Sequence, residues 1–120
     1  MKILLVAFGS AAGGVLRYLV SCWLAASKGF PWATLAVNVV GSLLIGLLSG
    51  FLARHGGSSA GSIRAFAVVG FCGGFTTFST FSNETFRMLE NSEWLSAVAY
   101  VAVSVLAGLA AVFIGYWLAK

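Results

Sequence analysis

The chain has 120 residues, of which 60% are hydrophobic and only 8% are charged, and its formal net charge is +4. An average soluble domain has about 25% charged residues, so this composition excludes a water-soluble globular protein and indicates a protein of the lipid bilayer. The Lys and Arg residues are scattered along the chain, whereas a nucleic-acid-binding protein gathers them on one face. Their placement is typical of the flanks of membrane spans.

Four apolar stretches are each long enough to cross a bilayer, which takes about 20 helical residues. In chain order they cover residues 3–26, 34–53, 63–86 and 94–119. Gly29 and Pro31 follow the first stretch and Gly56 follows the second, as is typical of residues that end helices. None of the stretches alternates apolar and polar residues as a β-barrel strand does. We therefore predict an all-α membrane protein, with a single domain of four transmembrane helices over residues 1–120.

The first two stretches each contain one polar residue that is unusual in lipid. Arg17 lies inside the first stretch, where a charged side chain costs about 3 kcal/mol on insertion scales and marks a candidate functional site. An arginine whose side chain extends to the membrane surface is an equal alternative. Asn38 in the second stretch fits either a hydrogen bond between helices or a functional amide.

Small residues recur at four-residue spacing in the first three stretches, and this spacing lets helix backbones approach closely. The positions are Gly9, Gly13, Ser42, Gly46, Gly50, Gly70 and Gly74. Helix packing accounts for the spacing. Because four helices are too few to enclose an aqueous path comfortably, we also expect subunits to associate.

Four spans place both termini on one side of the membrane. The positive-inside rule reads Lys and Arg near the span ends, and here they give only a weak bias. The basic residues on one side of the membrane are Lys2, Arg54, Arg64 and Lys120, and those on the other side are Lys28 and Arg87. We therefore predict that the chain inserts in both orientations. Two oppositely inserted copies could then form an antiparallel homodimer, which is a hypothesis at this point.

The third stretch contains a glycine pair and an aromatic pattern. Gly73-Gly74 predicts a break in the helix, because glycine has the lowest helix propensity after proline. A break at membrane depth frees backbone groups that protein, water or a ligand must satisfy, and transporters use freed carbonyls to hold cations. Four phenylalanines at helical spacing are expected on one helix face. They are Phe71, Phe75, Phe78 and Phe81.

Polar side chains follow the same segment on a neighbouring face. They are Thr76, Ser79, Thr80 and Asn83. Ser and Thr can return their hydroxyls to the carbonyl four residues back, so a purely structural role stays open. The hydroxyls, the phenylalanines and the glycine pair taken together favour an ion pathway.

We expect the ion to be a small anion. The first two stretches contain no acidic residue, and the three Glu residues lie near or beyond the end of the third, whereas cation pathways carry acidic residues inside their spans. The spans offer hydroxyls, the amide of Asn38 and the positive edges of phenylalanine rings. The sequence shows no catalytic nucleophile, metal triad or nucleotide-binding loop, so we predict that the protein is not an enzyme.

Three blocks of the sequence resemble the Fluc (CrcB) family of fluoride channels. They are residues 13–18 (GGVLRY), 31–42 (PWATLAVNVVGS) and 70–82 (GFCGGFTTFSTFS). Their combination is more specific than any one block. The resemblance implies an antiparallel, dual-topology homodimer in a bacterial inner membrane, with two pathways for passive fluoride export and a structural sodium ion at the centre.

The resemblance also implies roles for residues along the pathway. Phe78 and Phe81 would present their ring edges to fluoride. Asn38 would be the pore-lining amide, and Ser79 and Thr80 would belong to a polar track.

Further positions have implied roles outside that track. The backbone carbonyls of Gly73 and Thr76 would hold the sodium ion. Arg17 resembles an arginine on the vestibule side, and Glu84 resembles the acidic residue that follows the family's third-span motif. In the fourth stretch, two residues four apart on one face are further candidates for the pathway. These are Tyr100 and Ser104.

Two other classes of protein fit four spans less well. Small multidrug exporters carry a glutamate in the first span, which this sequence lacks. A membrane scaffold would account for the small-residue spacing but would leave the Thr/Ser/Phe segment of the third stretch unexplained.

Overall fold

The computed structural model describes residues 1–24 and 30–120, and the regular secondary structure in these residues is helical. The elements are α1 (Lys2–Trp23), α2 (Trp32–His55), α3 (Ala60–Ile63), the π-helix η1 (Arg64–Cys72), α4 (Gly73–Phe75), α5 (Phe78–Glu90) and α6 (Trp94–Ala119). Four helical segments in this part of the chain are long and apolar enough to cross a membrane, the third being Ala60–Glu90. The predicted four-helix architecture is confirmed, and the protein is a multi-pass membrane protein.

The helical segments differ from the predicted stretches mainly at their ends. α2 is longer than 34–53, and the third span is longer than 63–86. The last two residues of the predicted stretch 3–26 lie outside the described residues. Polar residues such as His55 continue the helices past the apolar stretches, because a helix satisfies its own backbone hydrogen bonds whether lipid or water surrounds it.

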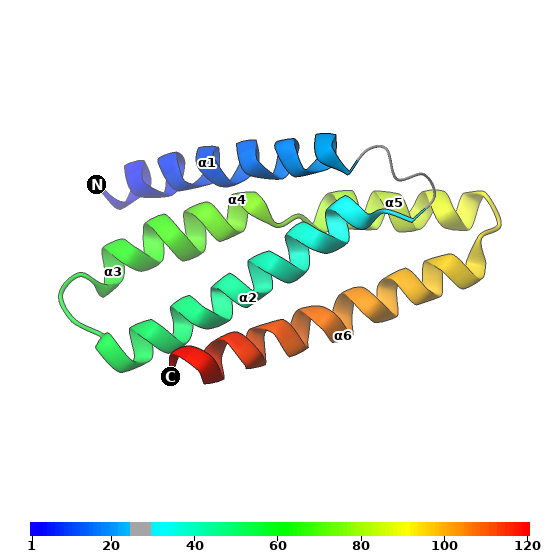
Figure 1. The fold of residues 1–120 in the computed structure, drawn as a ribbon. Coiled ribbons are helices and arrows are strands. Elements are labelled where there is room, and N and C mark those ends of the chain that lie inside the picture. Colours follow the sequence, from blue (N-terminus) through cyan, green and yellow to red (C-terminus); the bar gives the residue numbers. More distant parts are fainter. Residues whose placement is uncertain (25–29) are drawn as a thin grey trace.

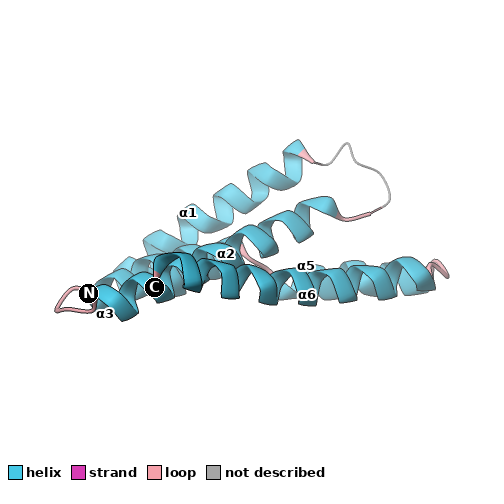
Figure 2. Ribbon diagram, turned by 60° about the horizontal axis from the view of Figure 1, so that its bottom comes forward, coloured by secondary structure: helices cyan, strands magenta, loops and turns pink. Residues whose placement is uncertain are grey.

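The four spans form two pairs, and both termini lie at the same end of the molecule (Figure 1). α1 packs along η1 and α4, whereas α2 packs along α6 and runs between α6 and the third span. Figure 2 shows that the C-terminal turns of α1 stand away from α5, whereas the first turn of α2 reaches α5 through the hydrogen bond from Thr34 to Glu84. The second half of the third span, α5, is therefore covered by α6 and not by α1.

The first half of the third span contains a nine-residue π-helix, Arg64–Cys72. In a π-helix each amide bonds to the carbonyl five residues back, and such segments are rare and frequently mark functional sites. This one leads directly into α4, the short segment before the interruption of the span.

Glycines set the distance between α1 and the third span. A Cβ at Gly13 would clash with the carbonyl oxygen of Phe71 and would lie 2.8 Å from the amide nitrogen of Phe75. The neighbouring Gly14 has nothing within 4 Å of its Cβ position. The small-residue spacing thus corresponds to a close helix contact at Gly13, whereas Gly14, which is not part of that series, faces open space.

Replacing Gly13 by Ala is expected to destabilise the protein by about 1–3 kcal/mol, because overpacking forces the backbones apart. Gly14→Ala makes the same chemical change one residue away and should leave stability unchanged or slightly higher. Thermal unfolding in detergent, followed by tryptophan fluorescence, measures both variants. Equal unfolding temperatures for Gly13→Ala and Gly14→Ala would contradict this account of the contact.

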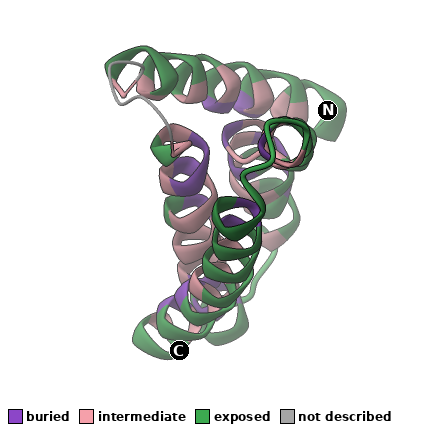
Figure 3. Ribbon diagram, turned by 90° about the vertical axis from the view of Figure 1, so that its right-hand side faces the viewer, coloured by how far each residue is buried: buried purple, intermediate pink, exposed green. Residues whose placement is uncertain are grey.

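About half of the described residues are exposed when a single subunit is considered, and buried positions lie on the inner faces of the helices (Figure 3). Large apolar side chains such as Phe8 and Trp117 are exposed, as expected for a surface that contacts lipid or a second subunit. Cys72 is fully buried, but Cys22, for which the apolar sequence also predicts burial, is exposed in the single subunit.

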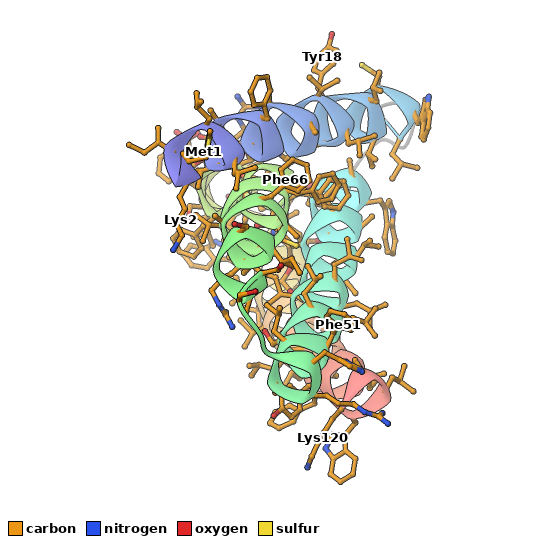
Figure 4. All side chains as sticks on the ribbon, turned by 90° about the vertical axis from the view of Figure 1, so that its left-hand side faces the viewer. Met1, Lys2, Tyr18, Phe51, Phe66 and Lys120 are labelled. Carbon is orange, nitrogen blue, oxygen red and sulfur yellow. The ribbon has the colours of Figure 1, made fainter. Side chains whose placement is uncertain are left out.

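Figure 4 looks onto the end of the molecule where the termini lie, with Lys2 and Lys120 labelled. The Arg54 guanidinium donates a hydrogen bond to the carbonyl of Lys120 there (3.4 Å). Tyr18 projects from α1 away from the other helices. This end is basic, in keeping with residues that flank membrane spans.

Candidate functional site

The third span is interrupted at Thr76 and Thr77, whose backbones are extended (φ −90°, ψ 161° and φ −152°, ψ 124°). The prediction of a broken third span agrees with the structure, but its position at Gly73-Gly74 is wrong, because both glycines are helical. β-branched residues such as threonine favour extended backbone. Gly74 instead allows close packing, since a Cβ there would lie 2.5 Å from the carbonyl oxygen of Ser10.

Asn38 stabilises the interruption through both the nitrogen and the oxygen of its side-chain amide. Its Nδ2 donates to the carbonyl of Thr77 (3.0 Å), and the amide nitrogen of Thr77 donates to its Oδ1 (2.8 Å). The side chain therefore replaces the helical partners that Thr77 has lost. One N–H of Nδ2 is left over from this pair, and Asn38 also lines two cavities beside the break. Of the two alternatives for Asn38, the hydrogen bond between elements is observed, and the remaining donor keeps the functional role open.

The threonines around the break satisfy part of its backbone. The Thr77 hydroxyl caps α5 by accepting a hydrogen bond from the amide nitrogen of Thr80 (3.3 Å). The Thr76 hydroxyl donates to the carbonyl of Cys72, four residues back (2.9 Å). Part of the predicted hydroxyl track thus has a structural role, while Ser79 is exposed, 3.5 Å from the Thr77 hydroxyl.

Arg17 reaches from α1 to the break. Its Nε donates to the carbonyl of Gly74 (3.1 Å), and the side chain is half-buried. Of the two alternatives for Arg17, the structure shows a contact with the third span. With Thr34, Thr77 and Thr80, Arg17 lines a small cavity of about 40 Å³. The guanidinium thus stabilises a helix-end carbonyl and places positive charge beside the interruption.

Three further carbonyls at the break have no partner in the described part of the chain. They are those of Gly73, Phe75 and Thr76. The amide that would reach the carbonyl of Gly73 in a continuous helix belongs to Thr77 and bonds to Asn38. The amide of Thr80, which would reach the carbonyl of Thr76, bonds to the Thr77 hydroxyl. Among the described residues, no backbone hydrogen bond outside the helices ends on any of the three oxygens.

The phenylalanines form two separate pairs. Phe71 and Phe75 stack before the break (centroids 5.8 Å apart), and Phe78 and Phe81 lie after it (5.9 Å). The prediction that all four share one helix face is wrong, because the extended residues between the pairs change the direction of the chain. Phe75 is buried, whereas Phe78 is 78% exposed in the single subunit.

Phe78 and Phe81 line a groove between α2, α5 and α6. The groove has a volume of about 180 Å³, and its polar lining residues are Asn38, Ser42 and Ser104. The hydroxyl oxygen of Ser104 is buried and has no hydrogen-bond partner in the described residues. The structure therefore brings together four residues that the sequence singles out for a pathway. They are Asn38, Phe78, Phe81 and Ser104.

Glu84, in the middle of α5, forms a separate hydrogen-bonded cluster. Thr34 Oγ1 donates to one carboxylate oxygen (3.0 Å), and the hydroxyl of Tyr100 donates to the other (2.8 Å). Tyr100 is fully buried, and its ring lies 4.9 Å from that of Phe81. Tyr100 and Ser104 are therefore placed differently: Tyr100 joins this cluster and Ser104 lines the groove. Nothing in the sequence marks Thr34 as a site residue, because only the fold brings it to Glu84.

These features define a helical, multi-pass membrane protein whose polar residues gather where its third span is interrupted. A family profile described as "CrcB-like protein, Camphor Resistance (CrcB)" matches residues 4–116. The chain belongs to this family, and the family assignment made from the sequence is confirmed.

Curated relatives cover nearly the whole chain. A protein of Rhizobium meliloti is 47% identical over 115 residues, which is 94% of this chain and 91% of the relative. A protein of Leptospira interrogans is 41% identical over 99% of this chain and 94% of its own length. A protein of Nitrobacter winogradskyi is 49% identical over 94% of this chain and 90% of its own length. Each of these relatives is named "Fluoride-specific ion channel FluC".

Proposed function

We propose that this protein is a fluoride channel that lowers cytoplasmic fluoride by passive export. The observation that carries the proposal is the groove in which Asn38, Ser104, Phe78 and Phe81 meet beside the interrupted span. The relatives' names give the ion. They are named as ion channels, and the expectation that the chain is not an enzyme agrees with them.

The chemistry of the groove suits a small anion. Its polar atoms are amide and hydroxyl groups, and its aromatic edges carry partial positive charge. No acidic residue lines it among the described residues. Conduction requires an ion to bind strongly enough to enter and weakly enough to leave. Several weak donors in series meet this requirement, whereas one desolvated arginine in the path would trap the ion.

We further propose that two copies assemble as an antiparallel, dual-topology homodimer with two pathways. The groove opens on the side of the single subunit, where Phe78 is 78% exposed. A second copy would close the groove and cover this ring. We place the dimer in a bacterial inner membrane, since the relatives described above are bacterial.

A structural sodium ion fits the carbonyls left unpaired at the break. Sodium is a hard cation for which oxygen is a suitable ligand, and the carbonyls of Gly73 and Thr76 lack partners in the described residues. Gly73 is also exposed in the single subunit. Two carbonyls from each of two subunits would supply four oxygens to an ion on the dimer axis. The bound ion would supply fixed positive charge and would stiffen the break.

Fluoride efflux from liposomes that contain the purified protein tests the channel. A fluoride electrode should record rapid release, with little release from chloride-loaded vesicles. Phe81→Ile should reduce fluoride efflux by at least about tenfold, because it removes an aromatic edge from the groove. Phe113→Ile, which changes an exposed ring on α6, is the matched control. Well-folded protein without fluoride release would refute the channel and favour a membrane scaffold.

Orientation and sodium each have a direct test. In sealed spheroplasts, an external protease should remove a cleavable C-terminal tag from about half of the molecules; removal from all or from none would refute dual topology.

In detergent, sodium should raise the unfolding temperature of the dimer above that in N-methylglucamine. Equal temperatures in the two cations would argue against the sodium site.

A further inference from the structure

Ser42 lies at the junction of two cavities beside the break. It follows Asn38 by one turn on the same face of α2 and is half-buried. The groove between α2, α5 and α6 and a second cavity of about 230 Å³ beside Thr76 and Thr77 share three lining residues. These residues are Asn38, Ser42 and Phe78. An ion that moves from one cavity to the other therefore passes Ser42.

The hydroxyl of Ser42 is free to contact such an ion. A helical serine usually returns its hydroxyl to the carbonyl four residues back, as the threonines Thr76 and Thr85 do here. No side-chain hydrogen bond of Ser42 is found among the described residues, in contrast to its neighbour Asn38. In the described part of the chain, the other serine of the groove, Ser104, also has no hydrogen-bond partner for its hydroxyl.

We propose that Ser42 donates its hydroxyl to the permeating anion as the ion passes Phe78, and that Ser42 is a further ion-binding residue of the pathway. This inference rests on the proposed channel function. Four residues of α-helix span about 6 Å, so Ser42 provides a donor one step beyond the free N–H of Asn38. An anion leaving the amide then meets a hydroxyl while ring edges of Phe78 remain beside it.

The competing explanation is that this position needs only a small side chain for helix packing. The sequence places it in a series of small residues with Gly46 and Gly50, and a Cβ at Gly108 of α6 would lie 3.6 Å from the Ser42 hydroxyl oxygen. Helix packing of this kind needs a small side chain and does not need a hydroxyl. Alanine therefore separates the two explanations, because it keeps the size and removes only the donor.

Fluoride efflux from liposomes, measured for Ser42→Ala, tests the proposal. We expect about a tenfold slower efflux, as follows from losing one hydrogen bond to a charged group, with an unchanged unfolding temperature. Ser96→Ala, an exposed position on α6 outside the cavities, is the matched control and should behave as the unmodified protein. Adding Gly108→Ser to Ser42→Ala returns a hydroxyl from the opposite wall of the groove and should restore part of the efflux.

Two outcomes would overturn the role of Ser42. One is an efflux from Ser42→Ala equal to that of the unmodified protein. The other is a slower efflux that comes with a lower unfolding temperature or loss of the dimer, which would assign Ser42 to packing. Failure of the channel function itself is distinguishable, because the unmodified protein would then release no fluoride at all.

Discussion

Replacing Asn38 by Leu is expected to abolish fluoride efflux and to lower the stability of the protein by about 2–4 kcal/mol. Leucine has the same number and branching of side-chain heavy atoms as asparagine but offers Thr77 neither a donor nor an acceptor. Both hydrogen bonds to the Thr77 backbone would be lost, and each polar group left unpaired away from water costs about 1–3 kcal/mol. The break would then rearrange, and Phe78 and Phe81 would leave their positions beside the groove.

Thermal unfolding in detergent and liposome efflux measure the two effects of Asn38→Leu. Asn83→Leu makes the same change on an exposed position of α5 and serves as the control. Asn38→Asp keeps the acceptor for the Thr77 amide but sets an oxygen against the Thr77 carbonyl, so its stability should lie between those of the other two variants. An unfolding temperature for Asn38→Leu equal to that of Asn83→Leu would show that the amide does not hold the break.

Replacing Glu84 by Ala is expected to destabilise the protein by about 2–4 kcal/mol. Two hydroxyls donate to this carboxylate, and both belong to buried residues, Thr34 and Tyr100. Removing the acceptor leaves both donors unpaired, and an unsatisfied buried group costs more than the net gain from one hydrogen bond. Since the Tyr100 ring packs 4.9 Å from that of Phe81, the loss should also slow fluoride efflux.

Three further variants refine the test of the Glu84 cluster. Glu84→Gln keeps a group that can accept from one hydroxyl and donate to the other, so it should cost less than Glu84→Ala. Tyr100→Phe leaves Thr34 bonded and should cost about 1 kcal/mol. Glu90→Ala changes an exposed carboxylate at the end of the same helix and should have almost no effect. If Glu84→Ala unfolds at the same temperature as Glu90→Ala, the cluster does not stabilise the fold.

The sequence predicts the four spans well because the length of an apolar helix is set by the thickness of the bilayer and not by contacts within the protein. It also singles out Arg17 and Asn38, since a polar side chain in an apolar stretch needs a partner. Neither partner is local: Arg17 bonds to Gly74, and Asn38 bonds to Thr77. Both residues were recognised from the sequence, but their contacts depend on how the helices pack.

The position of the break could not be read from helix propensity. Glycine is unfavourable in a helix by only about 1 kcal/mol, and close packing of Gly74 against α1 offsets this cost. The chain instead leaves the helix where Asn38 and the Thr77 hydroxyl provide hydrogen-bond partners. The single-face prediction for the phenylalanines failed for the same reason, because it assumed a continuous helix through Thr76 and Thr77.

The π-helix of the third span also bears on how the length of the chain can vary. A π-helix bonds each amide to the carbonyl five residues back and therefore uses more residues per turn than an α-helix does. Deleting one residue within Arg64–Cys72 would let this segment close towards ordinary α-helical turns while the helix on either side keeps its direction. A one-residue length difference among relatives is therefore expected within residues 64–72 as readily as in the connectors and at the span ends.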